Sequence, residues 1–286
     1  MIDCHTHIIA PWQTEPLTEE KLLEAVDALG IDRFVVLPIG VSPETPYEYF
    51  GTDDVLESYN RHPDRIIPFC SLDPRNGSNS PETDFSWILG KCKEQGCKGL
   101  GELTANMYFD DPKCKNLYNH CGRIGLPVLF HLAERFIGTY GLVDDAGLPR
   151  LDACLRECPN TVFIAHGPAF WSEIGRDVDE ATRGGYPKGK VVPGRLQQLL
   201  KQYPNLYGDL SADSGFNAIT RDPDYGYEFL DEFQDKLLFG TDICNVGQVV
   251  PIVGYFRQGL KDGVISRASY DKITELNAIR IFDLSK

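Results

Sequence analysis

Two histidines near the start of the chain have a spacing that could hold a metal ion. His5 and His7 are two residues apart at the end of the apolar segment Met1–His7. In an extended strand such side chains share a face and lie about 6.5–7 Å apart along it. Two imidazoles on one face can bind a common metal ion. Two polar residues that merely end a strand would give the same pattern, so the rest of the sequence must decide.

The other histidines favour the metal interpretation. The chain has six histidines, and four of them end predicted strands: His5, His7, His131 and His166. In an α/β barrel the carboxyl ends of the strands converge on the active site, so these four imidazoles are expected at one mouth. His62 and His120 fall in helical or turn segments, and we interpret both as structural.

Two carboxylates also end apolar runs. Asp242 closes Leu-Leu-Phe-Gly-Thr-Asp, where burial is costly without a partner. It is either the N-cap of a helix or, as we favour here, a metal ligand that also accepts a proton. Glu102 follows Gly-Leu-Gly, and glycines allow close approach of backbone or ligand. Glu102 either bridges two metal ions or is a loop carboxylate that orients a ligating histidine.

Eight apolar runs, mostly about 30 residues apart, are separated by helical stretches and predict the fold. They are Met1–His7, Phe34–Ile39, Ile66–Leu72, Lys98–Leu103, Pro127–Leu132, Thr161–His166, Leu206–Ser211 and Lys236–Asp242. Alternating strands and helices, with strands apolar throughout, predict a parallel sheet covered on both faces. Eight such units favour closure into a (β/α)8 TIM barrel, and we expect one domain over residues 1–286.

Local signals mark several helix boundaries. Thr18 and Thr52 are expected to cap helices, and either Pro149 or Leu151 to open another. One long segment rich in Gly and charge, from Gly167 to about Pro193, follows the sixth strand and is expected as a loop that could fold over the site.

Charge and composition limit the partners. The net charge is −14 with a pI near 4.8, which argues against nucleic acid or an anionic membrane surface as a partner. An anionic small molecule stays open, because a bound metal ion can reverse the local potential. We expect a cytoplasmic protein with a small-molecule substrate, since neither a signal peptide nor a membrane span is evident; a homo-oligomer stays open.

The nine cysteines indicate reduced thiols. Their number is odd and they are scattered along the chain. Cys92 and Cys97 lack a second pair at the spacing of a zinc ribbon, so we expect buried thiols without disulfides and not a structural zinc site.

These motifs together resemble the amidohydrolase superfamily. Asp3-Cys4-His5-Thr6-His7 resembles its opening D-x-H-x-H motif. Four later segments resemble its strand-4 acid, strand-5 His, strand-6 His and strand-8 Asp, in that order: Gly101–Thr104, Phe130-His131, Ala165–Gly167 and Gly240–Asp242. His62–Arg65, Gly30–Leu37 and Asn277–Phe282 are similar to the amidohydrolase-related branch that includes aminocarboxymuconate-semialdehyde decarboxylase. Cys244 stands where that branch often has proline.

The resemblance implies a metal-dependent hydrolase. It places one divalent ion, zinc or similar, on His5, His7, His131 and Asp242, with Asp242 as the proton acceptor. His166 either holds a second ion bridged by Glu102 or serves as an acid/base group. The expected substrate is a small amide, lactone or ester.

Two rival functions remain. A decarboxylase on the same scaffold would need one metal ion, with His166 as proton donor, and a barrel that binds metal without catalysis is the other.

Several further residues are expected near the mouth or in the loop after the sixth strand. Trp171 either forms a wall of the pocket or anchors its loop. Asp213 is expected to cap a helix, although Asp213 and Ser211 could instead contact substrate. Arg176 and Arg183 are expected in solvent, with an anionic substrate as the alternative.

Overall fold

The computed structural model describes residues 1–9, 15–40, 50–136 and 138–285. Its strands in chain order are β1 (Ile2–Thr6), β2 (Arg33–Val36), β3 (Ile66–Pro68), β4 (Leu100–Leu103), β5 (Val128–Ala133), β6 (Leu142–Val143), β7 (Phe163–His166), β8 (Leu206–Asp209) and β9 (Leu237–Leu238). Each of the eight predicted apolar runs overlaps one of these strands. The additional short strand, β6, pairs with the end of β5 and was not predicted.

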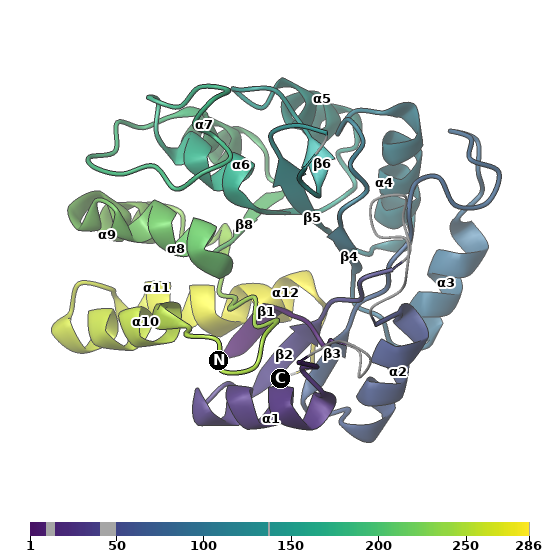
Figure 1. Ribbon diagram of the computed structural model, residues 1–286, viewed down its shortest axis with the longest axis horizontal. Coiled ribbons are helices and arrows are strands. Elements are labelled where there is room, and N and C mark those ends of the chain that lie inside the picture. The colour runs from purple at the N-terminus through teal and green to yellow at the C-terminus, as the bar shows by residue number, and fades with distance from the viewer. Residues whose placement is uncertain (10–14, 41–49, 137, 286) are drawn as a thin grey trace.

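Helices separate the strands and surround them on the outside (Figure 1). The α-helices are α1 (Glu19–Ala28), α2 (Thr52–Arg61), α3 (Ser86–Glu94), α4 (Pro112–Ile124), α5 (Pro149–Glu157), α6 (Pro168–Trp171), α7 (Arg195–Gln202), α8 (Ala212–Thr220), α9 (Pro223–Glu232), α10 (Pro251–Asp262), α11 (Arg267–Asp271) and α12 (Asn277–Ile281). A 3-10 turn η1 (Ser172–Ile174) and a π-turn η2 (Lys272–Leu276) continue α6 and α11.

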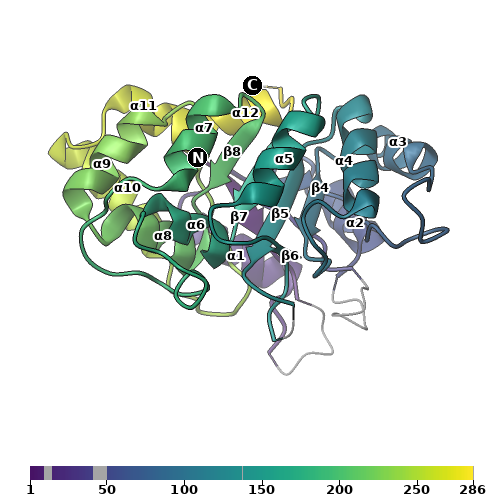
Figure 2. The same ribbon diagram turned by 90° about the horizontal axis from the view of Figure 1, so that it is seen from above.

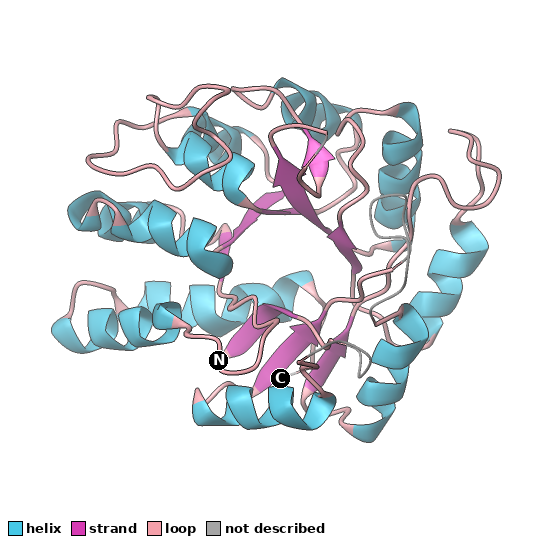
Figure 3. Cartoon of the chain, viewed as in Figure 1, coloured by secondary structure: helices cyan, strands magenta, loops and turns pink. Residues whose placement is uncertain are grey.

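The strands form a closed parallel barrel. One sheet has the order β1-β2-β3 and the other β4-β5-β7-β8-β9, and every pairing within them is parallel. A parallel bridge between Cys70 and Leu100 joins the two sheets at one seam. The other seam is joined where the Cys4 amide donates to the Phe239 carbonyl at 2.9 Å. The ring of strands inside its ring of helices is visible in Figure 3, and the predicted TIM barrel is confirmed.

Two apolar cores support this barrel. The larger one fills the layer between strands and helices, and the smaller one fills the barrel interior with alternate strand residues such as Ile2, Val35 and Ile164. Ala278 and Phe282, in and just after α12, belong to the inner core, so the C-terminal segment closes the end of the barrel opposite the site. Figure 2 shows α12 at the edge of the barrel beside the C-terminus.

Helix starts follow the predicted capping chemistry in part. The Thr18 hydroxyl accepts a hydrogen bond from the Lys21 amide at the start of α1, and α5 begins at Pro149. The prediction for Thr52 is wrong: Gly51 is the N-cap of α2, and the Thr52 hydroxyl instead accepts from the Ser71 amide at 3.0 Å. A threonine hydroxyl can accept a hydrogen bond from the backbone amide of a distant loop as readily as from an amide of its own helix.

The segment after β7 is more ordered than predicted. It opens with α6 and η1, and an antiparallel bridge between Gly175 and Pro193 closes the remainder into a loop.

In the described part of the chain, no helix combines the length and apolar character needed for a bilayer span. All nine cysteines are free thiols; eight are buried and Cys244 is half-buried.

Candidate metal centre

Backbone irregularities in β1 and β4 direct the first ligand candidates into the barrel mouth. The pairing of β1 with β2 shifts by one residue between Asp3 and Thr6, and that of β4 with β5 shifts between Leu100 and Leu103. A bulge of this kind changes which face the following side chains occupy. Ile2 and Cys4 therefore fill the barrel interior, while His5 lies among the polar residues of the mouth.

The imidazoles of His5 and His7 converge on one point. Their Nε2 atoms are 3.1 Å apart, and Asp242 Oδ1 lies 3.4 Å from the first and 3.5 Å from the second. Two ligands bonded to one ion at about 2.0–2.1 Å are themselves roughly 3–3.4 Å apart. The spacing of these three side chains therefore fits a shared divalent cation.

Glu102 faces two pairs of histidines with its two oxygens. Its Oε2 lies 3.9 Å from His5 Nε2 and 3.6 Å from His7 Nε2. Its Oε1 lies 2.9 Å from His131 Nδ1 and 3.9 Å from His166 Nε2. The structure thus divides the predicted ligands into one group of His5, His7 and Glu102 and another of Glu102, His131 and His166. His131, predicted beside His5 and His7, lies on the second side.

The outward nitrogens of three histidines are held by other groups. His5 Nδ1 donates to Asp209 Oδ2 at 2.7 Å and His7 Nδ1 to the Leu37 carbonyl at 3.1 Å. His166 Nδ1 contacts the Ser211 hydroxyl at 3.0 Å. Fixing Nδ1 in this way turns Nε2 toward Asp242 and the centre of the site, which is the usual arrangement of histidines that bind metal ions. The donor set therefore fits a metal site.

Asp209 is a buried carboxylate of this site that was not predicted from the sequence. Its carboxylate also lies 3.4 Å from His166 Nδ1, so it contacts histidines from two strands. A signal was present in the sequence, since Asp209 is a carboxylate inside the apolar run Leu206–Ser211. Such a residue is rarely buried without a charged or donor partner.

The carboxylates make this site attractive to cations. Burial alone would lower the pKa of His5, but Asp242 and Asp209 raise it to about 10. Burial alone would likewise raise the pKa of Glu102, yet the hydrogen bond from His131 and the nearby imidazoles hold it well below its usual value. Burial lowers the pKa of His7 and His131, which favours the neutral imidazole that binds metals.

A cavity of about 360 Å³ opens directly over these groups. His131, His166 and Asp242 line it together with Tyr140 and Tyr186. The Tyr140 ring lies 4.3 Å from the His131 ring, measured between centroids. Tyr186 belongs to the loop after η1, so the long segment predicted to fold over the site does line its mouth.

Several residues predicted near the mouth have other roles. Trp171 is buried and donates its indole N–H to the Asp209 carbonyl at 2.8 Å, so it anchors its loop. The capping prediction for Asp213 is wrong, because Ser211 is the N-cap of α8. Arg176 is exposed as predicted, whereas Arg183 is fully buried and donates to the Asp144 carbonyl.

The two remaining histidines lie elsewhere. His62 Nε2 is 3.0 Å from Glu19 Oε1, beside α1. His120, in α4, places Nδ1 2.9 Å from the Asn116 carbonyl. Both belong to the helical layer, in agreement with their interpretation as structural residues.

Comparison with known proteins identifies the family. The fold and the arrangement of histidines and carboxylates at its mouth define a metal-site TIM barrel of the amidohydrolase type. The family model described as "Amidohydrolase" matches residues 2–284, and this chain belongs to that family. No match was found among curated proteins.

Solved structures with similar folds include hydrolases and decarboxylases. A probable 2-pyrone-4,6-dicarboxylic acid hydrolase from Acinetobacter baumannii is 13% identical with a TM-score of 0.60, and the match covers 99% of each chain. A 5-carboxyvanillate decarboxylase from Sphingomonas paucimobilis is 16% identical with a TM-score of 0.62, over 100% of this chain and 99% of that one. A manganese-bound dihydroxybenzoic acid decarboxylase from a Polaromonas species is 16% identical with a TM-score of 0.60, over 100% and 97%.

Proposed function

We propose that this protein is a metal-dependent hydrolase that cleaves an amide, lactone or ester bond in a small molecule. The observation that carries the proposal is the position of Glu102, whose two oxygens face two different pairs of histidines. One carboxylate between two ligand groups is the arrangement expected where two metal ions are held side by side. His5, His7 and Asp242 would hold the first ion and His131 and His166 the second, with zinc as the expected metal.

Each group then has a definite task. Bound divalent ions lower the pKa of water and polarise a carbonyl group. Asp242 lines the cavity and is one-fifth exposed, so it can take a proton from the attacking water and return it to the leaving group. Asp209 positions His5, while Tyr140 and Tyr186 confine the substrate.

One observation favours decarboxylation as the second candidate. The 2.9 Å separation between Glu102 Oε1 and His131 Nδ1 is also that of an ordinary hydrogen bond. In that case Glu102 only orients His131, the centre holds one ion, and His166 is available as a proton donor to a carbanion left by loss of CO2. Structural neighbours of both kinds are known, so the number of metal ions becomes the deciding quantity.

The test is the substitution Glu102→Gln, which nearly preserves shape and removes charge. Wild-type protein saturated with zinc is expected to retain two equivalents per chain after desalting, and the variant one. Hydrolysis of a panel of lactones, amides and esters should fall with the lost ion. Glu134→Gln is the matched control, because Glu134 lines the same cavity outside both ligand groups.

A single equivalent in the wild type that Glu102→Gln still retains would contradict the two-metal proposal. CO2 release from aromatic carboxylic acids, with no hydrolysis of the panel, would then establish the decarboxylase. As a check on folding, the circular dichroism spectrum and the melting temperature of each metal-free variant must match those of the metal-free wild type.

A further inference from the structure

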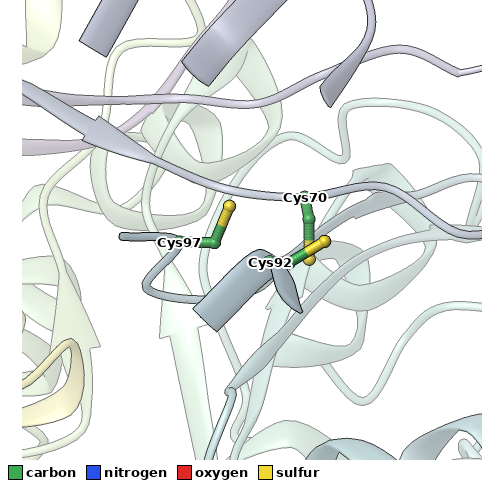
Figure 4. Close-up of side chains that lie close together, drawn as sticks. All are labelled: Cys70, Cys92 and Cys97. Carbon is green, nitrogen blue, oxygen red and sulfur yellow. The ribbon is translucent and has the colours of Figure 1, made fainter. Parts of the chain in front are cut away.

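Three cysteines outside the proposed metal centre come together in the layer between strands and helices. Cys70 follows β3, Cys92 lies in α3, and Cys97 lies between α3 and β4. Their sulfur atoms are all within 4.8 Å of one another, as the side chains in Figure 4 illustrate. Each residue is at most 5% exposed. In the sequence, Cys92 and Cys97 have no second cysteine pair at zinc-ribbon spacing; the fold brings Cys70 to them.

Backbone hydrogen bonds fix the positions of these cysteines. The Cys70 amide donates to the Gly99 carbonyl at 3.0 Å, and the Gly101 amide donates to the Cys70 carbonyl at 2.9 Å, across the seam between the two sheets. The Cys97 amide donates to the Cys92 carbonyl at 3.0 Å at the end of α3. These bonds hold the backbone of all three cysteines in place, so that the fold itself brings their side chains together.

The number and type of donors select the ion. Structural zinc in proteins almost always takes four protein ligands. Among the described residues, the group consists of three sulfurs, and no histidine, aspartate or glutamate completes it. The trio lies in the apolar core, where water is a poor fourth ligand. Three sulfurs bonded to one ion at about 2.3 Å would be roughly 4 Å apart, which these positions allow.

We propose that Cys70, Cys92 and Cys97 form a binding site for a soft monovalent metal ion, of which copper(I) is the natural representative. Soft thiolate ligands prefer such ions, and copper(I) accepts low coordination numbers. On binding, the S–H bonds of Cys92 and Cys97 break, two protons pass to solvent, and two copper–sulfur bonds form. Cys70 keeps its proton, which it donates to the Gly99 carbonyl, and approaches the ion through a sulfur lone pair.

This division of roles limits the buried charge. Two thiolates and one copper(I) leave the site with a single negative charge, whereas three thiolates would leave two in an apolar core. The ion would also connect the segment after β3 to α3 and to the segment that leads into β4, because each sulfur comes from a different one of these. Binding should therefore raise the melting temperature of the protein.

The experiment titrates reduced, full-length protein anaerobically with copper(I) supplied by a chromophoric chelator. Copper retained after desalting and copper–thiolate absorption in the near ultraviolet are measured together. The double substitution Cys92→Ser/Cys97→Ser should lose one equivalent of copper, the associated absorption and the rise in melting temperature. Cys114→Ser is the matched control and should retain all three, because Cys114 is equally buried in α4 but outside the trio.

Alkylation mapping of the wild type avoids reliance on the variants. Copper(I) should protect Cys92 and Cys97 from an alkylating reagent under mild denaturation, with Cys114 labelled as before. Equal copper binding by wild type and double variant, or copper-independent labelling of Cys92 and Cys97, would overturn the proposal. Zinc retained at the trio in place of copper(I) would overturn the assignment to a soft monovalent ion.

Discussion

Substitution of Asp209 by asparagine offers the sharpest test of the proposed metal centre. The carboxylate of Asp209 is fully buried and accepts from His5 Nδ1 at 2.7 Å and from the Ser211 amide at 2.9 Å. Burial alone would raise its pKa, but its charge interaction with His5 and the hydrogen bonds from His166 and His5 hold the pKa well below its usual value. Asp209 is therefore an anion that orients two proposed ligands.

The size of the effect follows from that role. Asparagine keeps the shape but removes the charge that makes the His5 imidazole a stronger ligand. Loss of such a partner typically weakens metal binding by about 10- to 100-fold. That corresponds to about 1.4–2.8 kcal/mol of binding free energy. Activity should fall at limiting metal and recover largely at saturating metal, because no proposed ligand atom is removed.

The assay is competition for zinc against a chromophoric chelator, with the melting temperature of the metal-free protein as a check on folding. Asp144→Asn is the matched control. Asp144 is also a buried carboxylate that accepts hydrogen bonds from backbone amides, but it belongs to neither group of proposed metal ligands. Zinc affinity within twofold of wild type in a folded Asp209→Asn variant would refute the orienting role. Equal weakening by the Asp144 substitution would refute its specificity.

The remaining predictions concern stability. Gly226→Ala should lower the free energy of unfolding by about 1–3 kcal/mol, because the new Cβ would lie 1.9 Å from the Ile219 carbonyl oxygen. Gly254→Ala, also within a helix but with open space around it, should instead raise the free energy of unfolding by about 0.5–1 kcal/mol. If urea unfolding showed that both substitutions stabilise the protein, or that both destabilise it, the described packing around these glycines would be contradicted. Trp171→Phe should cost about 1–3 kcal/mol by leaving a β8 carbonyl without its donor, and an unchanged urea midpoint would exclude this. Burial raises the pKa of Asp144 to about 6, above its unfolded value near 4, so its contribution to stability is present below pH 4 and is lost as the pH rises through about 6. Between about pH 4 and pH 6, the unfolding free energy of the wild type relative to that of Asp144→Asn should fall by about 3 kcal/mol. A rise over the same pH range would show that folding lowers the pKa of Asp144.

The order of strands and the proposed ligands could be predicted from the sequence because both follow local rules. Five of the eight apolar runs carry a histidine, aspartate or glutamate at or next to their last residue, and the carboxyl ends of parallel strands meet at one mouth. That reasoning brought His5, His166 and Asp242 together across more than 200 residues of chain. The family motifs strengthened it, since their order along the chain matched the order of strands.

Contacts between distant segments were decided only by the tertiary structure. Asp209 reaches His5 across 204 residues, and Cys70 joins Cys92 and Cys97 because the seam between β3 and β4 closes there. The division of the ligands on either side of Glu102 depends on the one-residue shift in β4, which no strand periodicity reveals. Periodicity fixes which residues end a strand, whereas register, bulges and side-chain partners depend on how the whole barrel packs.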